Sequence, residues 1–298
     1  MTIKELTFKA GQYLKEKEIE DPSKEAGLLL SYLLNKDLSY IYAHGDMELE
    51  ESIIKNYFEL VERRGNFEPF AYITGKCEFM SLTFDVDPSV LIPRADTEIL
   101  AEAVICALGG TFFWSSLSLS EKVYKLPPKP DYKGLDIGTG SGCLAISISK
   151  FVENITMTAV DISETALEIA RRNAVNNKVA DRIEFINADF LSDEFGLKDK
   201  YDIIVSNPPY IPDEDISSLM PSVKNYEPLT ALKGGRDGLV FYRELAKKAP
   251  LLLEPDGILA VECGYDQSEK IQQIFSEHNF ETTVLTDFSG INRAIIAK

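Results

Sequence analysis

Residues 134–298 alternate short apolar runs with helical patterns, and this alternation limits the possible folds more than any other feature of the chain. Strands that alternate with helices are typical of a parallel sheet with helices on both faces. Five such strands are expected, of which residues 258–261 form the last. Residues 282–285 and 294–297 are expected to form an antiparallel pair at one edge. The sequence therefore predicts an α/β fold with a doubly wound, Rossmann-like sheet of seven strands.

The first of these strands runs into three glycines spaced two residues apart. Glycine lets the backbone turn sharply and approach a ligand closely. A dinucleotide-binding loop has its third glycine three residues after the second, and Cys143 occupies that position here. The spacing disfavours a nicotinamide cofactor and resembles the cofactor loop of S-adenosylmethionine-dependent methyltransferases. The cofactor-binding residues predicted in this loop are Gly138, Thr139, Gly140, Ser141 and Gly142.

The next two strands are each followed by an acidic residue. Asp161 ends the second strand at the distance from the glycines where a ribose-binding carboxylate is expected, although it could instead cap the helix that follows. Asp189 and Phe190 follow the third strand, residues 183–187. An acid followed by an aromatic residue there can bind and cover an adenine, but an ordinary loop explains these two residues equally well. We predict that all three bind the cofactor.

The fourth strand, residues 201–206, is followed by Asn207, Pro208, Pro209 and Tyr210. Asparagine offers an amide oxygen, the prolines stiffen the turn without adding N–H donors, and tyrosine adds a flat ring. Such a pocket of acceptors suits a planar nitrogen that carries hydrogens. A strand that ends in a proline turn is the better interpretation of these four residues alone. The glycine loop upstream reverses this preference, because ligands of open α/β sheets bind at the carboxyl ends of the strands.

The overall charge argues against a nucleic-acid substrate. A chain of 298 residues suggests about two domains. Its formal net charge is −17, whereas proteins that bind nucleic-acid phosphates carry patches of Lys and Arg. An acidic excess favours a basic protein partner, but it is equally explained by solubility.

Cysteine and histidine are too few and too scattered to predict a metal centre. The chain has four cysteines without a CxxC pair and only two histidines. We therefore expect no metal, and reduced thiols in a cytoplasmic protein. The sequence shows neither a signal-peptide core nor an apolar run long enough to span a membrane, so no membrane association is expected.

The region before the glycine loop is predicted to contain a second domain. Residues 1–70 have helical spacing of apolar residues and an excess of acidic ones, and we interpret them as a helical domain that recognises a partner. A structural cap on the catalytic domain is nearly as good an interpretation. Residues 71–92 alternate in polarity and predict a β-hairpin linker. Residues 109–132, with Phe112, Phe113 and Trp114, are expected to form an irregular surface loop with an aromatic anchor.

Several motifs outside the glycine loop resemble one family. It is the PrmC/HemK family of protein-(glutamine-N5) methyltransferases, which modify peptide chain release factors. Asn-Pro-Pro-Tyr is shared with amino-methyltransferases of DNA and RNA, so the other motifs carry the resemblance. Ala95 departs from the proline usual in the family, and residues 109–130 are longer than usual. The motifs are Pro69 to Gly75, Glu78-Phe79, Val90 to Glu98, Val205 to Ile211, Glu227 to Leu232, Gly234 to Leu239 and Glu262 to Gln267.

The resemblance implies a class I methyltransferase domain over residues 93–298 and S-adenosyl-L-methionine as the cofactor. The implied substrate is the glutamine of the Gly-Gly-Gln motif in class 1 release factors. Asn207, Pro208 and Tyr210 become the catalytic candidates, with Pro209 as a further substrate-binding residue and Asn207 also beside the cofactor. The segment that starts at Arg94 would border the cofactor pocket, although Asp96 or Thr97 could simply cap a helix there.

Two alternatives remain. An N6-adenine or other exocyclic-amine methyltransferase of DNA or RNA would use the same chemistry, but the acidic charge argues against direct contact with nucleic acid. A non-catalytic scaffold that binds the cofactor would have no need of Asn207. We expect a monomeric enzyme.

Overall fold

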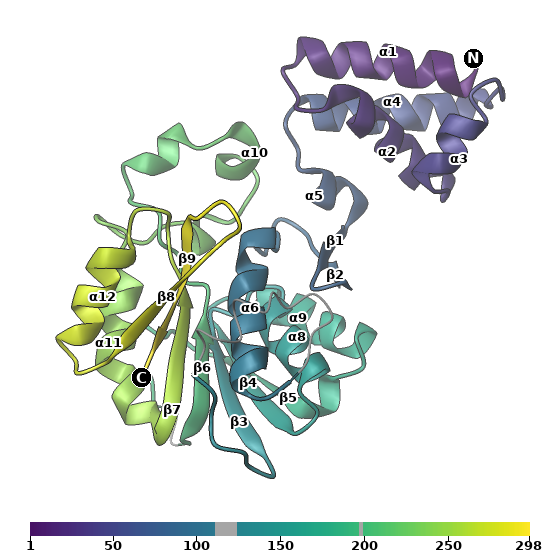
Figure 1. Ribbon diagram of the computed structural model, residues 1–298. Coiled ribbons are helices and arrows are strands. Elements are labelled where there is room, and N and C mark those ends of the chain that lie inside the picture. The colour runs from purple at the N-terminus through teal and green to yellow at the C-terminus, as the bar shows by residue number, and fades with distance from the viewer. Residues whose placement is uncertain (111–123, 197–198) are drawn as a thin grey trace. The chain divides into compact units, whose positions relative to one another are not determined.

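The computed structural model describes residues 1–110, 124–196 and 199–298, and it divides into two compact units (Figure 1). The helical unit consists of Met1–Gly75 and Met220–Tyr226. The sheet unit consists of Lys76–Leu219 and Glu227–Lys298. The three aromatic residues predicted to anchor an irregular loop, Phe112, Phe113 and Trp114, lie outside the described residues.

The helical unit encloses a small apolar core. Leu6, Leu14, Leu30 and Tyr57 are fully buried in it, and the Tyr57 hydroxyl donates a hydrogen bond to the Ala26 carbonyl at 2.7 Å. The first helix begins with a capping box, in which Thr2 and Glu5 satisfy each other's backbone N–H groups. The helices of this unit are α1 (Ile3–Glu16), α2 (Pro22–Leu34), α3 (Leu38–Ala43), α4 (Glu51–Gly65), α5 (Phe70–Thr74) and α10 (Pro221–Lys224).

The short helix α10 belongs to the helical unit although its residues come from the middle of the chain. The Tyr226 hydroxyl, just after α10, donates a hydrogen bond to the Asn66 carbonyl at 2.8 Å. Both ends of segment 220–226 continue into the sheet unit. The backbone therefore passes between the two units three times, after Gly75, Leu219 and Tyr226.

The sheet unit is built on a seven-stranded sheet with the order β5-β4-β3-β6-β7-β9-β8. Its first five strands in this order are parallel, while β9 runs antiparallel to both of its neighbours. The predicted doubly wound sheet with an antiparallel edge is thus confirmed. The strands are β3 (Tyr132–Ile137), β4 (Ile155–Asp161), β5 (Ile183–Asn187), β6 (Tyr201–Ser206), β7 (Leu253–Glu262), β8 (Thr282–Thr286) and β9 (Asn292–Ala297).

Helices cover both faces of this sheet, so the central strands are buried on both sides. All six residues of β6 are buried; Ile203 and Val205 join one core cluster, and Ile204 joins the other. The first cluster includes side chains of α6 (Ala95–Ala107), α8 (Cys143–Phe151) and α9 (Glu164–Asn176). The second includes side chains of α11 (Val240–Leu252) and α12 (Ser268–Ser276). The 3₁₀ turns are η1 (Ala180–Arg182), η2 (Asp215–Ser218) and η3 (Leu229–Ala231).

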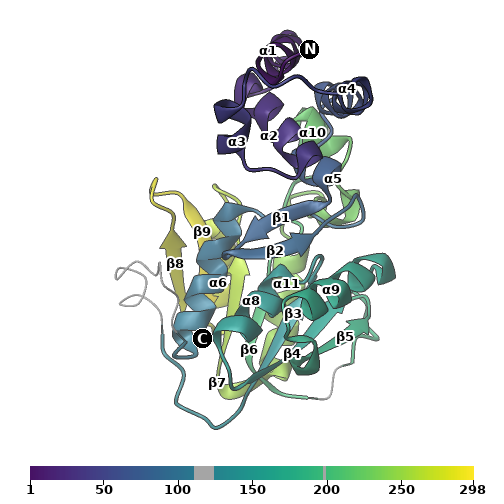
Figure 2. The same ribbon diagram turned by 90° about the vertical axis from the view of Figure 1, so that its right-hand side faces the viewer.

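A two-stranded hairpin, β1 (Lys76–Phe79) and β2 (Leu82–Asp85), lies on the same side of the sheet as α6 (Figure 2). Phe79 and Phe84 are buried in the first core cluster. The side chain of Asn173 on α9 exchanges two hydrogen bonds with the Asp85 backbone, at 2.7 and 3.0 Å. The hairpin is therefore fixed to the helix that follows β4.

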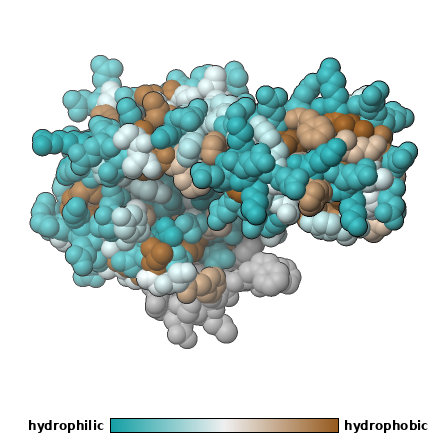
Figure 3. Space-filling view, turned by 90° about the horizontal axis from the view of Figure 1, so that it is seen from above, coloured by the Kyte–Doolittle hydropathy of each residue, from teal (hydrophilic) through white to brown (hydrophobic). Residues whose placement is uncertain are grey.

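The surface is consistent with the acidic composition. Most of the face shown in Figure 3 is hydrophilic, with apolar residues in small groups.

All four cysteines are free. None of the helices that the structure describes is long and apolar enough to cross a bilayer.

Candidate active site

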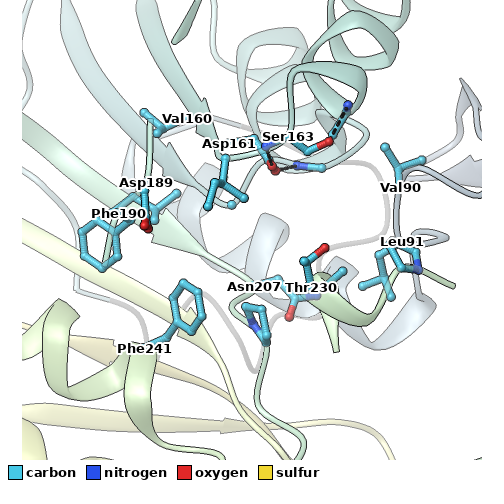
Figure 4. Close-up of a pocket in the computed structure, with 18 of the residues that line it drawn as sticks. Val90, Leu91, Val160, Asp161, Ser163, Asp189, Phe190, Asn207, Thr230 and Phe241 are labelled. Carbon is cyan, nitrogen blue, oxygen red and sulfur yellow. Dashed lines mark hydrogen bonds between the residues drawn. The ribbon is translucent and has the colours of Figure 1, made fainter. Parts of the chain in front are cut away.

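A cavity of about 540 Å³ lies at the carboxyl ends of four neighbouring strands, β5, β4, β3 and β6. Gly138 follows β3, Asp161 ends β4, Asp189 follows β5 and Asn207 follows β6, and all four line the cavity. Figure 4 shows Asp161 and Asn207 on opposite sides of the central space. The size falls within the usual range for small-molecule sites. Residues that the sequence marks at four separate strand ends thus share one pocket.

Two different structural reasons explain the glycines of the loop after β3. Gly138 and Gly140 have φ angles of +73° and +55°, and a Cβ atom on either would meet nothing within 4 Å. These two glycines therefore leave the cavity floor open. Gly142 has a φ of +83°, and its Cβ would stand 2.8 Å from the Ile146 side chain. Only glycine adopts such angles without strain, so the loop keeps its backbone exposed to a ligand.

Thr139 and Ser141 point away from the cavity into the protein. The Thr139 hydroxyl donates a hydrogen bond to Asp136 Oδ2 at 2.7 Å, and the Ala145 N–H donates to the same oxygen at 3.2 Å. Burial raises the pKa of Asp136 to about 7. The Ser141 carbonyl accepts from Asn173 at 2.9 Å. The two residues between the glycines therefore attach the loop to β3, α8 and α9. These contacts fix the backbone conformation of the exposed glycines.

Asp161 connects the glycine loop to the end of β4. Its Oδ2 accepts a hydrogen bond from the Gly140 N–H at 2.8 Å, and its Oδ1 accepts from the Ser163 N–H at 2.9 Å. Burial raises the pKa of Asp161, and these amide hydrogen bonds act in the opposite direction. The N-cap of α9 is Ser163, whose hydroxyl accepts from the Ala166 N–H at 3.2 Å. Asp161 thus lines the cavity and holds the loop, while its neighbour caps the helix.

The end of β5 contributes one carboxylate and one aromatic wall. Asp189 lines the cavity, and its Oδ1 accepts from the Leu191 N–H at 2.8 Å. Phe190 is almost completely buried and packs edge-on against Phe195 with ring centroids 5.1 Å apart. Phe241 on α11 adds a second aromatic side chain to the lining. Its helix starts at Val240, well after the Asn-Pro-Pro-Tyr motif, so sequence spacing did not predict its place in the lining.

Asn207 has a fixed amide group at the cavity. Its Nδ2 donates a hydrogen bond to the Thr97 hydroxyl at 3.2 Å, and its Oδ1 accepts none from the described residues. Thr97 lies in the first turn of α6, whose N-cap is Arg94. The expectation that Thr97 or Asp96 caps this helix is therefore wrong, because the helix starts earlier and Thr97 faces Asn207 instead.

Pro209 lines the cavity, whereas Pro208 is buried beside it and Tyr210 is half-buried. The Tyr210 backbone is held closely: its carbonyl accepts from the Gln267 side chain at 2.9 Å. A Cβ on Gly238 would approach that carbonyl oxygen to 2.3 Å, and a Cβ on Gly234 would approach the Tyr210 Cα to 2.8 Å. Gly234 and Gly238 therefore let a second loop pack against the end of β6.

An ion pair between a buried carboxylate and a partly exposed arginine lies beside residues 228–231 of the cavity lining. Glu227 is 5% exposed and pairs with Arg94. Burial raises the pKa of Glu227, and Arg94 lowers it. Glu227 immediately precedes residues 228–231, which line the cavity. Asp136, Glu227 and Phe241 were not predicted as site residues, and Thr97 was predicted only as part of the segment that starts at Arg94. Among them, the charge of Asp136 inside a buried strand was the one local signal.

Comparison with known proteins identifies the family. The model of the PrmC N-terminal domain matches residues 5–75, and that of the methyltransferase small domain matches residues 103–221. A release factor glutamine methyltransferase of Clostridium acetobutylicum is 37% identical over 298 residues, covering 100% of this chain and 98% of the relative. The chain belongs to the release factor glutamine methyltransferase family. The resemblance to PrmC/HemK seen in the sequence is thereby confirmed, and the protein is a methyltransferase.

Other relatives agree. The release factor glutamine methyltransferase of Clostridium botulinum is 34% identical, covering 100% of this chain and 99% of the relative. A bifunctional methyltransferase of Rickettsia felis is 37% identical, but this chain matches only 58% of its length. Among solved structures, the hMettl16 catalytic domain in complex with MAT2A 3'UTR hairpin 1 has a TM-score of 0.54 at 15% identity, covering 84% of this chain and 81% of that chain. This likeness shows the methyltransferase fold and nothing about the substrate.

Proposed function

We propose that this enzyme transfers a methyl group from S-adenosyl-L-methionine to the side-chain amide nitrogen, N5, of the glutamine in the Gly-Gly-Gln motif of class 1 release factors. The observation that carries the proposal is the hydrogen bonding of the Asn207 side-chain amide. Its NH₂ group is held by Thr97, and its oxygen is left to accept a hydrogen bond at the cavity. A substrate amide offers the N–H groups that this oxygen can accept.

The cavity suits the proposed cofactor. The open backbone at Gly138 and Gly140 would lie against the amino-acid part of the cofactor, and Asp161 would accept hydrogen bonds from its ribose. The Asp189 carboxylate and the ring of Phe190 would flank the adenine. When bound, S-adenosyl-L-methionine supplies an electrophilic methyl group on a positively charged sulfur.

The residues at the strand end would bind and orient the nucleophile. An amide nitrogen is a poor nucleophile because its lone pair is delocalised into the carbonyl. The Asn207 oxygen would accept one N–H of the glutamine and the Pro208 carbonyl the other, which aims the nitrogen at the methyl group. Orientation of two bound reactants can contribute up to roughly 7–11 kcal/mol. The two acceptors would also stabilise positive charge that develops on the nitrogen. Tyr210 would pack on the substrate amide, and the proton would leave late, to water.

The proposed partner is a whole release factor. The names of the relatives support this choice, and the net charge of −17 supports a protein rather than a nucleic acid. The helical unit would recognise a second surface of the release factor, which raises the effective concentration of its Gly-Gly-Gln loop at the cavity. We further propose that the enzyme acts as a monomer in the cytoplasm.

The test is transfer of a labelled methyl group to three purified substrates: a class 1 release factor, the same factor with its glutamine replaced by alanine, and RNA. We expect label on the first alone, and mass spectrometry should place one methyl on the glutamine side chain. Equal labelling of the alanine variant would refute the assigned target. Labelling of RNA without labelling of the release factor would favour an exocyclic-amine methyltransferase.

A further inference from the structure

Two hydrogen-bonded pairs of side chains connect the Asn-Pro-Pro-Tyr motif to α6 and β7, and no part of the proposed mechanism uses both of them. Asn207 Nδ2 donates to the Thr97 hydroxyl at 3.2 Å, and the Tyr210 hydroxyl donates to Glu262 Oε1 at 3.4 Å. Glu262 ends β7 and is 3% exposed, and Thr97 is 1% exposed. Ser206 pairs with Val261 across β6 and β7, so Asn207 and Glu262 follow matched positions on neighbouring strands. The hydroxyls of Thr97 and Tyr210 both lower the pKa of the Glu262 carboxyl.

Burial acts in the opposite direction and raises the pKa of Glu262 to about 7. The second carboxylate oxygen, Oε2, is buried and accepts no hydrogen bond from the described residues. A carboxylate in this position is costly unless it serves as an acceptor. Stability alone would favour an apolar residue here, so the carboxylate calls for a further explanation.

The direction of the hydrogen bonds around Thr97 follows from the single proton that its hydroxyl carries. A threonine hydroxyl donates one hydrogen bond and accepts others. If its proton points to the Glu262 carboxylate, the hydroxyl can only accept from its other neighbour, so the group of Asn207 that faces it must be the NH₂. The Asn207 oxygen then faces away from Thr97. If the proton instead pointed to Asn207, the amide would turn over and present its NH₂ to the substrate amide.

We propose that Glu262 is a positioning residue that acts through Thr97 to hold the Asn207 amide with its oxygen toward the substrate nitrogen. This inference rests on the proposed function and adds the residue that sets the direction of its key hydrogen bond. Tyr210 donates to the same carboxylate from the other side, so one buried acceptor orients two residues of the Asn-Pro-Pro-Tyr motif. Hydrogen bonds from residues that do not touch the substrate keep a substrate-binding side chain in the geometry that the reaction needs.

Three variants separate positioning from packing. Thr97→Val removes the hydroxyl with little change of shape, and Thr97→Ser keeps the hydroxyl. Glu262→Gln keeps the shape but puts a donor beside Thr97, which allows the amide of Asn207 to turn over. Tyr242→Phe is the matched control, because the Tyr242 hydroxyl donates to the Glu262 main-chain carbonyl at 2.8 Å and not to its carboxylate.

The assay measures kcat, KM for the release factor and the Kd for S-adenosyl-L-methionine at pH 8, where most Glu262 carboxyls are ionised. We expect Thr97→Val and Glu262→Gln to lower kcat by roughly 10- to 100-fold while the cofactor Kd stays within about twofold. Thr97→Ser should restore kcat to within about threefold of the parent, and Tyr242→Phe should lower the melting temperature but not kcat.

A second measurement does not depend on turnover. The side-chain NH₂ protons of Asn207, assigned in ¹⁵N spectra of the free enzyme by their loss in Asn207→Asp, should exchange slowly with water in the parent and in Thr97→Ser, and faster in Thr97→Val. Unchanged exchange together with unchanged kcat in Thr97→Val would overturn the inference. If the parent enzyme fails to methylate the release factor, the proposed function fails, and the exchange measurement still decides the role of Thr97.

Discussion

Replacement of Asp161 by alanine tests the cavity as a cofactor site. In the structure the carboxylate accepts two backbone hydrogen bonds, from Gly140 at 2.8 Å and from Ser163 at 2.9 Å. The proposed ribose contact would add a charge-assisted hydrogen bond of roughly 1.5–3 kcal/mol, so Asp161→Ala should weaken cofactor binding by roughly 10- to 150-fold. Loss of the hydrogen bond to Gly140 would also loosen the glycine loop and act in the same direction.

The effect on stability should be smaller. Burial raises the pKa of Asp161, which means that the folded protein already bears a cost for its charge. Water in the open cavity can also replace the lost acceptor at Gly140. We therefore expect a loss of only about 1 kcal/mol of unfolding free energy.

Titration calorimetry with S-adenosyl-L-methionine, paired with urea unfolding, measures both quantities. Glu164→Ala is the matched control, because Glu164 is an exposed acid in the first turn of α9 that does not line the cavity. A Kd for Asp161→Ala within about twofold of the control would refute the ribose contact. The same result would show that the hydrogen bond from Gly140 has no effect on cofactor binding.

Three further predictions follow from other parts of the molecule. Asn207→Ala should lower kcat by at least about 100-fold with little change in cofactor Kd, measured by methyl transfer and calorimetry; near-normal turnover would contradict the mechanism. Burial raises the pKa of Asp136 to about 7. Between about pH 4 and pH 7 the folded state therefore binds more protons than the unfolded state. The contribution of Asp136 to the free energy of unfolding then falls as the pH rises through this window. Urea unfolding should show that the parent loses about 2 kcal/mol more unfolding free energy than Asp136→Asn between pH 5 and pH 7.5. If the unfolding free energies of the two proteins change with pH in parallel, the raised pKa is disproved. Phe8 on α1 and Tyr42 on α3 are 65% and 67% exposed, so Phe8→Ser with Tyr42→Ser should slow methylation of whole release factor several-fold while a short Gly-Gly-Gln peptide is unaffected. Equal effects on both substrates would exclude a recognition role for these two side chains.

The sheet could be predicted because its signals are local. Before Gly138, Asp161 and Asn207, each strand has at least four consecutive buried residues, as expected for strands covered on both faces. Parallel strands bring their carboxyl ends to one edge, so the residues that follow them were expected to meet. That reasoning needs only the order of strands and helices.

The supporting residues could not be predicted in this way. Thr97 and Glu262 reach the Asn-Pro-Pro-Tyr motif from positions 110 residues before Asn207 and 52 residues after Tyr210. Both are polar residues at the end of an element, where a helix cap or a solvated strand end is the ordinary interpretation. Only the packing of α6 against the sheet shows that each is buried and faces the motif. The positions of Thr139 and Ser141 likewise depended on contacts with Asp136 of β3 and Asn173 of α9.

The insertion of residues 220–226 into the helical unit has a consequence for how the chain is made. During synthesis the first 75 residues emerge early, but α10 follows only after β3, β4, β5 and β6 have been translated. The helical unit is therefore incomplete until most of the parallel sheet exists, so the two units must mature in overlapping order rather than one after the other. The same arrangement matters for protein engineering. A chimera that exchanges residues 1–75 between relatives would join one protein's helices to another protein's α10, and a clean exchange must carry both segments.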